Sequence, residues 1–421
     1  MIETISLLPG ITLRCCRDTR FKQGCLTLQL VRPMAAEESA MNALIPAVLL
    51  RGTRRHPDLR SITPRLDELY GAALGPMVRR VGDYVNTGIS LSFMDDRFAL
   101  PGDRVLEPML DFLGEILLDY PVENQGFRAD FVESEKVNLI STIEAERNDK
   151  RIYTMNQMLR KLCSGDAFGL PRLGEKEQVA AVTPQGLLSH YRRILSESPI
   201  ELFYVGSAEP RLIAGKLAGI FEGLSRNVLT LPPQTGLQGG ETGDFTETME
   251  VSQGKLSMGF YTPITNRMPQ FPAMQILNTV FGAGMTSKLF MQVREKLSLC
   301  YSIGSSYYGT KGIVVVNAGV DFDKMDLTRE EILRQLDLCR QGHISDEELK
   351  SAREALLSGL RATHDSPGAI ESYYATAALS GMPLTAAQYA AAVESVTRED
   401  VAAAAQTLQL RVSYFLRGED R

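Results

Sequence analysis

The 421-residue sequence contains no tryptophan, only four histidines and no pair of cysteines spaced as Cys-x-x-Cys. It has no Gly-x-Ser-x-Gly elbow, no glycine-rich phosphate loop and no recognisable Cys/His pairing, so an active hydrolase with one of these sites is not expected. No apolar run approaches the ~20 residues that a membrane-spanning helix needs. These absences remove the usual signatures of nucleotide-binding, serine-hydrolase and membrane-spanning proteins.

Charge gives little indication of a partner. The formal net charge is -6 and the isoelectric point is near 5.5, with lysine and arginine spread along the whole chain. Such a distribution offers no basic surface for nucleic acid or for an anionic membrane, and neither partner is expected. Residues 1–10 lack the basic, apolar and small-residue regions of a secretory signal, so we expect a cytoplasmic location.

The cysteines are expected to be reduced, buried and structural, because scattered thiols without a signal peptide rarely form a disulfide framework. Two of them are adjacent in a predicted strand and should therefore point to opposite faces of a sheet. The six are Cys15, Cys16, Cys25, Cys163, Cys300 and Cys339.

The histidines do not form a recognisable metal site. His343 has Asp346 and Glu347 at i+3 and i+4, but Ser345 resembles a helix N-cap and would leave His343 in the preceding loop. No two histidines are close enough in sequence to share a helical face. All four, His56, His190, His343 and His364, are therefore predicted to be surface or loop residues.

Hydrophobic periodicity divides the first half into strands and helices. The segment 41–50 is apolar on nearly every side and predicts a buried helix that stops at Gly52. Thr63, followed by Pro64, predicts the N-cap of a helix over residues 61–70. The other expected elements are strands at 11–15, 25–31 and 200–205, two strands within 78–93, and helices at 105–118, 127–163 and 210–224.

The second half repeats this sequence of strands, paired helices, strands and long helices. The expected elements are strands at 248–261, 301–308, 312–320 and 411–416, and helices at 268–281, 287–296 and within 323–408. Strands and helices that segregate in this way favour an α+β fold: two homologous domains, each an antiparallel sheet with helices packed on one face. A length of 421 residues also indicates more than one domain.

The boundary between the halves is predicted from composition. Residues 228–243 are rich in proline, glycine and threonine and lack the apolar residues that would pack, so they are expected to form an exposed linker. The predicted organisation is a first domain over 1–227, a linker over 228–246 and a second domain over 247–421.

Two segments that flank the apolar helix carry a family resemblance. Met34-Ala-Ala-Glu-Glu38 and Leu50-Arg-Gly-Thr53 resemble the opening of the pitrilysin/insulinase (inverzincin) peptidases, which have the fold of LuxS/MPP-like metallohydrolases. In that family the intervening helix carries His-x-x-Glu-His. Two histidines at i and i+4 bind zinc from one helical face, and the glutamate activates the metal-bound water.

Aligned on these flanks, the five motif positions of this chain are residues 43–47. Ala43 and Ala47 replace the histidines and Pro46 replaces the glutamate. A methyl group cannot coordinate a cation, and proline cannot accept a proton. Because proline also breaks a helical hydrogen bond at a cost of ~3 kcal/mol, we expect an irregular start to this helix.

The resemblance implies a third zinc ligand, a glutamate, on a later helix. Glu135 is the best match to that position, in the stretch Phe131-Val-Glu-Ser-Glu-Lys136. One carboxylate cannot hold zinc alone. The resemblance therefore implies no metal and no cofactor in this chain, and the bland interpretation of Glu135 is a solvated helical carboxylate.

The C-terminal signature of the family is better preserved. The stretches 285–290 and 293–302 resemble it, and Arg294 and Tyr301 match an arginine and a tyrosine that bind the backbone carbonyl of the substrate. Both side chains are hydrogen-bond donors suited to that role. The chain departs from the family at Ser298, where glycine is usual. Alternatively, Arg294 forms an ion pair and Tyr301 is an ordinary strand aromatic.

The resemblance covers nearly the whole chain and implies a non-catalytic subunit of a heterodimeric zinc peptidase. The partner, a zinc-bearing paralogue, would supply the metal, although a homodimer remains open. This chain would supply Arg294 and Tyr301 to a peptide substrate. The alternative is a stand-alone peptide-binding or scaffold protein without peptidase activity. The bacterial subgroup that the chain most resembles is associated with elongation factor P modification.

Overall fold

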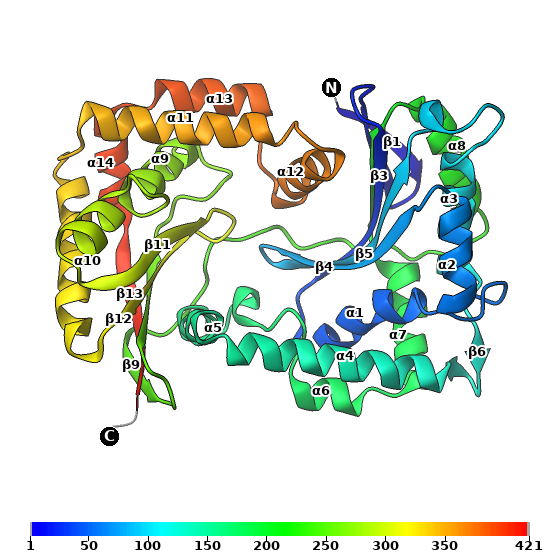
Figure 1. The fold of residues 1–421 in the computed structure, drawn as a ribbon, viewed down its shortest axis with the longest axis horizontal. Coiled ribbons are helices and arrows are strands. Elements are labelled where there is room, and N and C mark those ends of the chain that lie inside the picture. The colour runs from blue at the N-terminus through cyan, green and yellow to red at the C-terminus, as the bar shows by residue number, and fades with distance from the viewer. Residues whose placement is uncertain (1, 419–421) are drawn as a thin grey trace. The chain divides into compact units, whose positions relative to one another are not determined.

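The computed structural model describes residues 2–418, which form two compact units (Figure 1). Unit 1 is built from residues up to 144, from 170–233 and from 363–376. Unit 2 is built from residues 145–169, from 234–362 and from 377 onward. Each unit therefore contains one segment from the opposite half of the sequence.

Unit 1 contains a six-stranded sheet, sheet 1, in which only β2 and β8 run parallel. Its order is β1 (Ile2–Leu8), β2 (Ile11–Arg17), β8 (Ile200–Gly206), β3 (Gln23–Pro33), β5 (Tyr84–Met94) and β4 (Ala73–Val81). A two-stranded ribbon pairs β6 (Val122–Glu123) with β7 (Gly126–Phe127). The strands predicted in this half are confirmed, and β4 and β5 are joined by a turn at Gly82.

The helices that begin in unit 1 lie both before and after β8, the last strand of this unit, in the sequence. They are α1 (Ala36–Leu49), α2 (Leu59–Glu68), η1 (Asp96–Phe98), α3 (Leu106–Leu118), α4 (Ala129–Asn148), α6 (Lys176–Ala181), α7 (Pro184–Glu197), α8 (Pro210–Phe221) and α12 (Pro367–Ser380).

Unit 2 contains a five-stranded sheet, sheet 2. Its order is β11 (Cys300–Tyr308), β12 (Ile313–Val320), β10 (Gly254–Tyr261), β13 (Gln409–Arg417) and β9 (Gly243–Thr248). Its helices are α5 (Lys150–Leu162), η2 (Ala167–Gly169), α9 (Phe271–Phe281), η3 (Leu289–Lys296), η4 (Phe322–Lys324), α10 (Met325–Arg340), α11 (Asp346–Ala362), α13 (Ala386–Ser395) and α14 (Arg398–Thr407).

The two sheets have the same topology. Read from the parallel pair, sheet 1 runs β2-β8-β3-β5-β4 and sheet 2 runs β9-β13-β10-β12-β11. All other pairs in both sheets are antiparallel. The elements between equivalent strands also correspond in order, so that α1, α4 and α5 match α9, α11 and α12. The predicted α+β fold of two homologous domains is confirmed.

One face of each sheet is covered by helices of the same half. Leu26, Leu28 and Leu30 of β3 belong to a core with residues of α1, α3, α7 and α8. Leu256 and Met258 of β10 belong to the corresponding core with residues of α9, α10, α11, α13 and α14. The predicted cover of helices on one face therefore holds for both sheets.

The opposite face of each sheet is covered by a helix from the other half of the sequence. In unit 1, Ile370 and Ala375 of α12 pack with Cys25, Phe203 and Val205 of sheet 1. In unit 2, apolar residues of α5 pack with residues of β12 and β13, and these are Met158, Leu159, Leu162, Ile313, Val315 and Val412. The equivalent helices α5 and α12 are thus exchanged between the units.

The cysteine predictions are confirmed: all six are buried free thiols. Cys15 lies in the helix-covered core of unit 1, whereas Cys16 lies on the opposite face of sheet 1. Burial raises the pKa of the Cys15 thiol to about 12. Across residues 2–418, no helix has both the length and the apolar content to cross a membrane.

The apolar helix differs from its predicted form. Helix α1 begins regularly at Ala36, and Glu37 and Glu38 lie in its first turn, where the helix dipole favours them. The expected irregular start is therefore wrong, because Pro46 lies ten residues inside the helix. Proline has no N–H for the carbonyl of Asn42, and the hydroxyl of Thr87 on β5 donates to that carbonyl instead.

The predicted cap of the next helix is also wrong. Helix α2 begins at Leu59, four residues before Thr63. The side chain of Asp58 is the N-cap and accepts the backbone N–H of Ser61 at 2.9 Å. Asp58 starts the helix earlier because Ser61 completes a reciprocal capping box with it.

The predicted linker is partly fixed to unit 2. Residues 224–242 contain no helix or strand, but Leu237 donates its N–H to the carbonyl of Lys311, and Gln238 donates to the carboxylate of Asp166 at 2.9 Å. The Lys311 ammonium, which has no exposed area, pairs with Asp166 at 2.9 Å. The linker prediction missed this buried ion pair, because its members are distant in sequence.

The predicted long strand 248–261 is two strands. Strand β9 ends at Thr248 and β10 begins at Gly254 on the other side of β13. The predicted helix 287–296 is a π-helix, η3, whose end is marked by a bond from the Leu297 N–H to the Gln292 carbonyl. The turn that follows holds Ser298 at φ +49°, the left-handed region that glycine occupies without strain.

The role of Thr87 can be tested by a double-mutant cycle. Thr87→Val leaves the buried carbonyl of Asn42 without a donor and should lower the free energy of unfolding by about 1–3 kcal/mol. In a Pro46→Ala background residue 46 regains its N–H, so the cost of Thr87→Val should fall by about 1 kcal/mol or more. Denaturant unfolding measures both. Thr87→Ser keeps the hydroxyl and is the control; equal costs in both backgrounds would contradict the assignment.

Ser298 gives a second test of the backbone. Ser298→Gly should raise the free energy of unfolding by about 0.5–1 kcal/mol, because glycine removes the left-handed penalty but adds entropy to the unfolded chain. Ser298→Val should lower it, since a β-branched residue tolerates this conformation poorly. A loss of stability on Ser298→Gly would show that the serine side chain, not its backbone, matters here.

Candidate functional site

The positions that replace the zinc motif lie together on α1. Ala43 and Ala47 are one turn apart on the helix, the spacing that two ligating histidines would need. Ala43 and Pro46 are buried, and neither offers a lone pair to a cation. The helix therefore keeps the geometry of the motif without its donors.

The remaining carboxylate is already paired. Glu135 on α4 accepts a short hydrogen bond from the guanidinium of Arg51, the second residue after α1. The same guanidinium donates to the hydroxyl of Ser134 at 2.6 Å, and the amide of Asn138 donates to Glu135 at 3.1 Å. The interpretation of Glu135 as a solvated carboxylate is wrong, because Arg51 is sequence-remote and its approach depends on the packing of α1 with α4.

These residues do not fit a zinc ion. Structural and catalytic zinc sites use three or four His, Cys, Asp or Glu ligands that converge on one point. Two alanines, a proline and a carboxylate held by a guanidinium supply no such set. Within the described range 2–418, no group of three such residues is close enough to hold a metal ion.

A buried polar cluster lies beside α1. Glu38 pairs with Arg32 at 2.7 Å and with Arg193 at 2.8 Å. Burial alone would raise the pKa of Glu38, but the two guanidinium groups hold it below its usual range. Asn42 accepts from Nε2 of His190, 2.8 Å away, so the cluster fixes α1 against α7.

The predicted surface or loop position of His190 is wrong. His190 lies within α7 and is buried, not at the surface or in a loop. Burial lowers its pKa to about 4, and the nearby guanidinium groups act in the same direction, against the Glu38 charge. Its neighbours are an amide and a guanidinium, which makes it a structural residue. The helical pattern of 184–197 could have placed it inside, since it recurs with Leu187, Tyr191 and Ile194.

The other histidines lie outside helices and strands, as predicted. His56 contacts the Glu115 carboxylate through Nδ1 at 2.7 Å and packs edge-on against Phe112. His343 precedes α11, whose first turn is capped by the hydroxyl of Ser345, as expected. His364 packs against the ring of Tyr374.

Arg294 is presented by the π-helix η3. Its guanidinium lies 4.6 Å from the centre of the Phe290 ring, one π-turn earlier, and its Nε is 3.6 Å from the carboxylate of Glu295. That separation is too long for a hydrogen bond. The side chain is 40% exposed. π-Turns are rare and recur at functional sites.

Tyr301 is presented at the start of the edge strand β11. It is 60% exposed, and its hydroxyl donates to Asp321 at 2.9 Å. This hydrogen bond and the carboxylate charge raise the pKa of the phenol. The charge of Arg294 also reaches Cys300, the neighbour of Tyr301, where burial raises the thiol pKa to about 11 and Arg294 opposes the rise.

Exposed apolar side chains lie near Arg294 and Tyr301 in the sequence, and the sequence pattern did not predict their exposure. Met285 is 75% exposed, and Met291 and Leu297 are each about half exposed. All three belong to the stretch from residue 285 to 301 that carries Arg294 and Tyr301. Exposed methionines are flexible and suit binding of varied apolar side chains. Their place in the signature was the only sequence signal.

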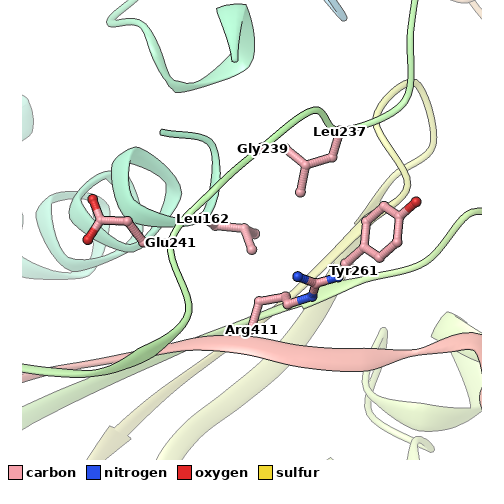
Figure 2. Close-up of a pocket in the computed structure, with 6 residues that line it drawn as sticks. All are labelled: Leu162, Leu237, Gly239, Glu241, Tyr261 and Arg411. Atoms are coloured by element: carbon pink, nitrogen blue, oxygen red, sulfur yellow. The ribbon is translucent and has the colours of Figure 1, made fainter. Parts of the chain in front are cut away.

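A small cavity of about 190 Å³ lies elsewhere in unit 2 (Figure 2). The Arg411 guanidinium is 5.3 Å from the centre of the Tyr261 ring, and the Glu241 side chain points away from both. None of the site residues that the sequence predicts lines this cavity. Its lining is Leu162, Leu237, Gly239, Glu241, Tyr261 and Arg411.

Comparison with known proteins agrees with the degenerate site. The sequence model of the family described as "Peptidase M16 inactive domain" matches residues 181–356. The "Probable inactive metalloprotease YmfF" of Bacillus subtilis (strain 168) is 26% identical over 411 residues, which cover 98% of this chain and 96% of that protein. The "Uncharacterized zinc protease YmxG" of the same organism is 23% identical over 291 residues, or 67% of each chain.

The fold is shared with solved structures. A conserved protein from Enterococcus faecalis V583 superposes with a TM-score of 0.91 at 24% identity, covering 100% of this chain and 99% of that chain. At this identity the likeness establishes the fold alone. Together with the family match over residues 181–356 and the relatives named above, these findings show that the chain is similar to peptidase M16 proteins, among them one named an inactive metalloprotease.

Proposed function

We propose that this chain is the zinc-less subunit of a heterodimeric zinc peptidase. Its partner, a zinc-bearing paralogue, supplies the metal and the general base. This chain supplies Arg294 and Tyr301, which hold a backbone carbonyl of the peptide substrate. Binding and water activation can be divided between two polypeptides because each needs only correct placement at the scissile bond.

The observation that carries the proposal is the contrast between the two motifs. The zinc positions hold Ala43, Pro46 and Ala47, whereas Arg294 and Tyr301 present polar groups to solvent. Arg294 does form an ion pair with Glu295, as the alternative interpretation expected, but the 3.6 Å separation is longer than a hydrogen bond. An exposed guanidinium with unused donors suits a ligand carbonyl better than a structural role.

The chemistry of the two donors is specific to an acyl group. The zinc of the partner would polarise the carbonyl and lower the pKa of the attacking water. The guanidinium of Arg294 would donate to a carbonyl oxygen on which negative charge develops. Tyr301 would exchange its bond with Asp321 for one with the peptide. Such donors matter most when the charge forms, so they act on the rate as well as on binding.

A zinc-bearing paralogue is a better partner than a second copy. A homodimer would place two chains together that both lack the ligand set, and would contain no metal centre. One organism, Bacillus subtilis, encodes two relatives of this chain, one named an inactive metalloprotease and the other a zinc protease. That pairing supports a division of labour between paralogues.

The proposal predicts activity only in a mixture. The chain and the zinc-bearing paralogue from its own organism, purified separately, should cleave a fluorogenic peptide together and not singly. Arg294→Ala should lower kcat/KM of the mixture by about 100–1000-fold, the usual loss for one donor to a developing oxyanion. Tyr301→Phe should lower it by about tenfold.

Two controls make the test specific. Arg411→Ala removes another partly exposed guanidinium of unit 2 that also lies over an aromatic ring, and it should leave kcat/KM within about twofold. Size-exclusion chromatography should show that Arg294→Ala still forms the complex. Unchanged activity in that variant would refute the assigned role. Peptide binding without any complex would favour a stand-alone scaffold protein.

The chain alone should not retain zinc. Elemental analysis after dialysis should find ~0.1 zinc per chain or less, because no ligand set converges on α1. The zinc-bearing paralogue, treated in parallel, should retain about one. One zinc per chain that is lost on Glu135→Gln would refute the interpretation of the site.

A further inference from the structure

A carboxylate is buried on the face of sheet 1 that its own helices do not cover. Glu371 of α12 is 1% exposed. Its oxygen Oε1 accepts from the hydroxyl of Thr27 at 2.8 Å, from the amide of Gln29 at 3.0 Å and from the guanidinium of Arg79 at 2.9 Å. Arg79 also donates to Oε2 at 2.9 Å. Residues 363–376, which carry Glu371, belong to unit 1.

Sheet 1 positions these donors through its own strands and hydrogen bonds. Thr27 and Gln29 are two residues apart on β3 and therefore share a face. Arg79 on β4 pairs directly with Asn86 on β5, and the amide of Asn86 donates to Oε1 of Gln29 at 3.2 Å. This bond orients Gln29 so that its NH₂ group faces Glu371. The receptor is built entirely from adjacent strands.

The receptor is suited to an anion. Toward Glu371 it presents a hydroxyl, an amide NH₂ and a guanidinium, which all donate. Thr27 and Gln29 are buried, so they would lack these partners if the carboxylate left without replacement. Arg79, in contrast, is about one-third exposed and gives a route from solvent to the receptor. A carboxylate satisfies all of these donors at once.

The segment that supplies the carboxylate has a narrow hold on sheet 1. In α12 the buried residues of unit 1 are Ile370, Glu371 and Ala375, on one helical face, with Tyr374 partly buried beside them. Ser372 is exposed, whereas Tyr373 is half-buried and its hydroxyl is out of contact with solvent. Burial and then the Glu371 charge raise the pKa of the Cys25 thiol beneath to about 12. The ionic contact is therefore the main polar anchor of this segment.

We propose that Thr27, Gln29 and Arg79 form a carboxylate-binding site, that Glu371 is its internal occupant, and that an acidic side chain of a peptide displaces it. The site does not depend on zinc, on a second subunit or on Arg294 and Tyr301. Its failure and the failure of the proposed peptidase role are therefore separate results. Displacement of Glu371 would free residues 363–376 from sheet 1.

Chemical rescue tests the receptor. Glu371→Ala removes the internal carboxylate and should lower the Tm. Sodium propionate at about 100 mM should then raise the Tm of this variant by about 3 °C or more and leave the wild type unchanged, because a ligand stabilises the state that binds it. Propionamide and sodium chloride at matched concentrations are the controls. Equal effects of propionate and propionamide, or no rescue, would overturn the proposal.

A second variant covers the case in which Glu371→Ala does not fold. Glu371→Gln keeps the volume and removes the charge. It should bind a fluorescein-labelled peptide that contains one glutamate at least tenfold more tightly than the wild type, measured by anisotropy, because the charged internal competitor is gone. The same peptide with glutamine should not gain, and adding Arg79→Gln should abolish the gain. Equal binding of both peptides would show that no carboxylate site exists.

Discussion

A mixed sheet that is apolar on both faces must have a layer of side chains packed on each face. In this protein each half of the chain provides helices for only one face of its sheet, and the second face is covered by a helix from the other half. Helices α5 and α12 are the equivalent elements of the duplicated fold, and both are exchanged. Because of this exchange, each compact unit contains one segment from the other half of the chain.

The same requirement explains why the degenerate helix persists. Leu44, Ile45 and Val48 of α1 are buried in the core of unit 1, and they hold the helix irrespective of its lost ligands. Pro46 is tolerated because Thr87 satisfies the carbonyl that proline abandons. Packing and metal chemistry are thus separable on one helix: its apolar residues keep it in the core although Ala43, Pro46 and Ala47 offer no metal ligand.

Strain is concentrated near the other candidate site. A π-helix, a left-handed serine and a mostly exposed tyrosine occur within the stretch from residue 289 to 301. Leu289 and Val293 anchor the π-helix in the core of unit 2, but the π-helix and the left-handed serine still cost free energy relative to an ordinary helix and turn. Arg294 and Tyr301, for which a substrate-binding role is proposed, lie in this same stretch.

The sequence alone determined the type of nearly every element and the duplicated α+β fold, because these follow from periodicity and composition. Its resemblance to the pitrilysin/insulinase peptidases located residues 43–47, whose side chains offer no metal ligand. The sequence did not reveal the partners of buried charges: Arg51 with Glu135, Asp166 with Lys311, and Glu371 with Arg79 are separated by 84 residues or more. Nor could it show that Pro46 sits mid-helix beside Thr87. Only tertiary packing decides which distant groups share a low-dielectric interior, because local patterns contain no information about contacts between remote segments.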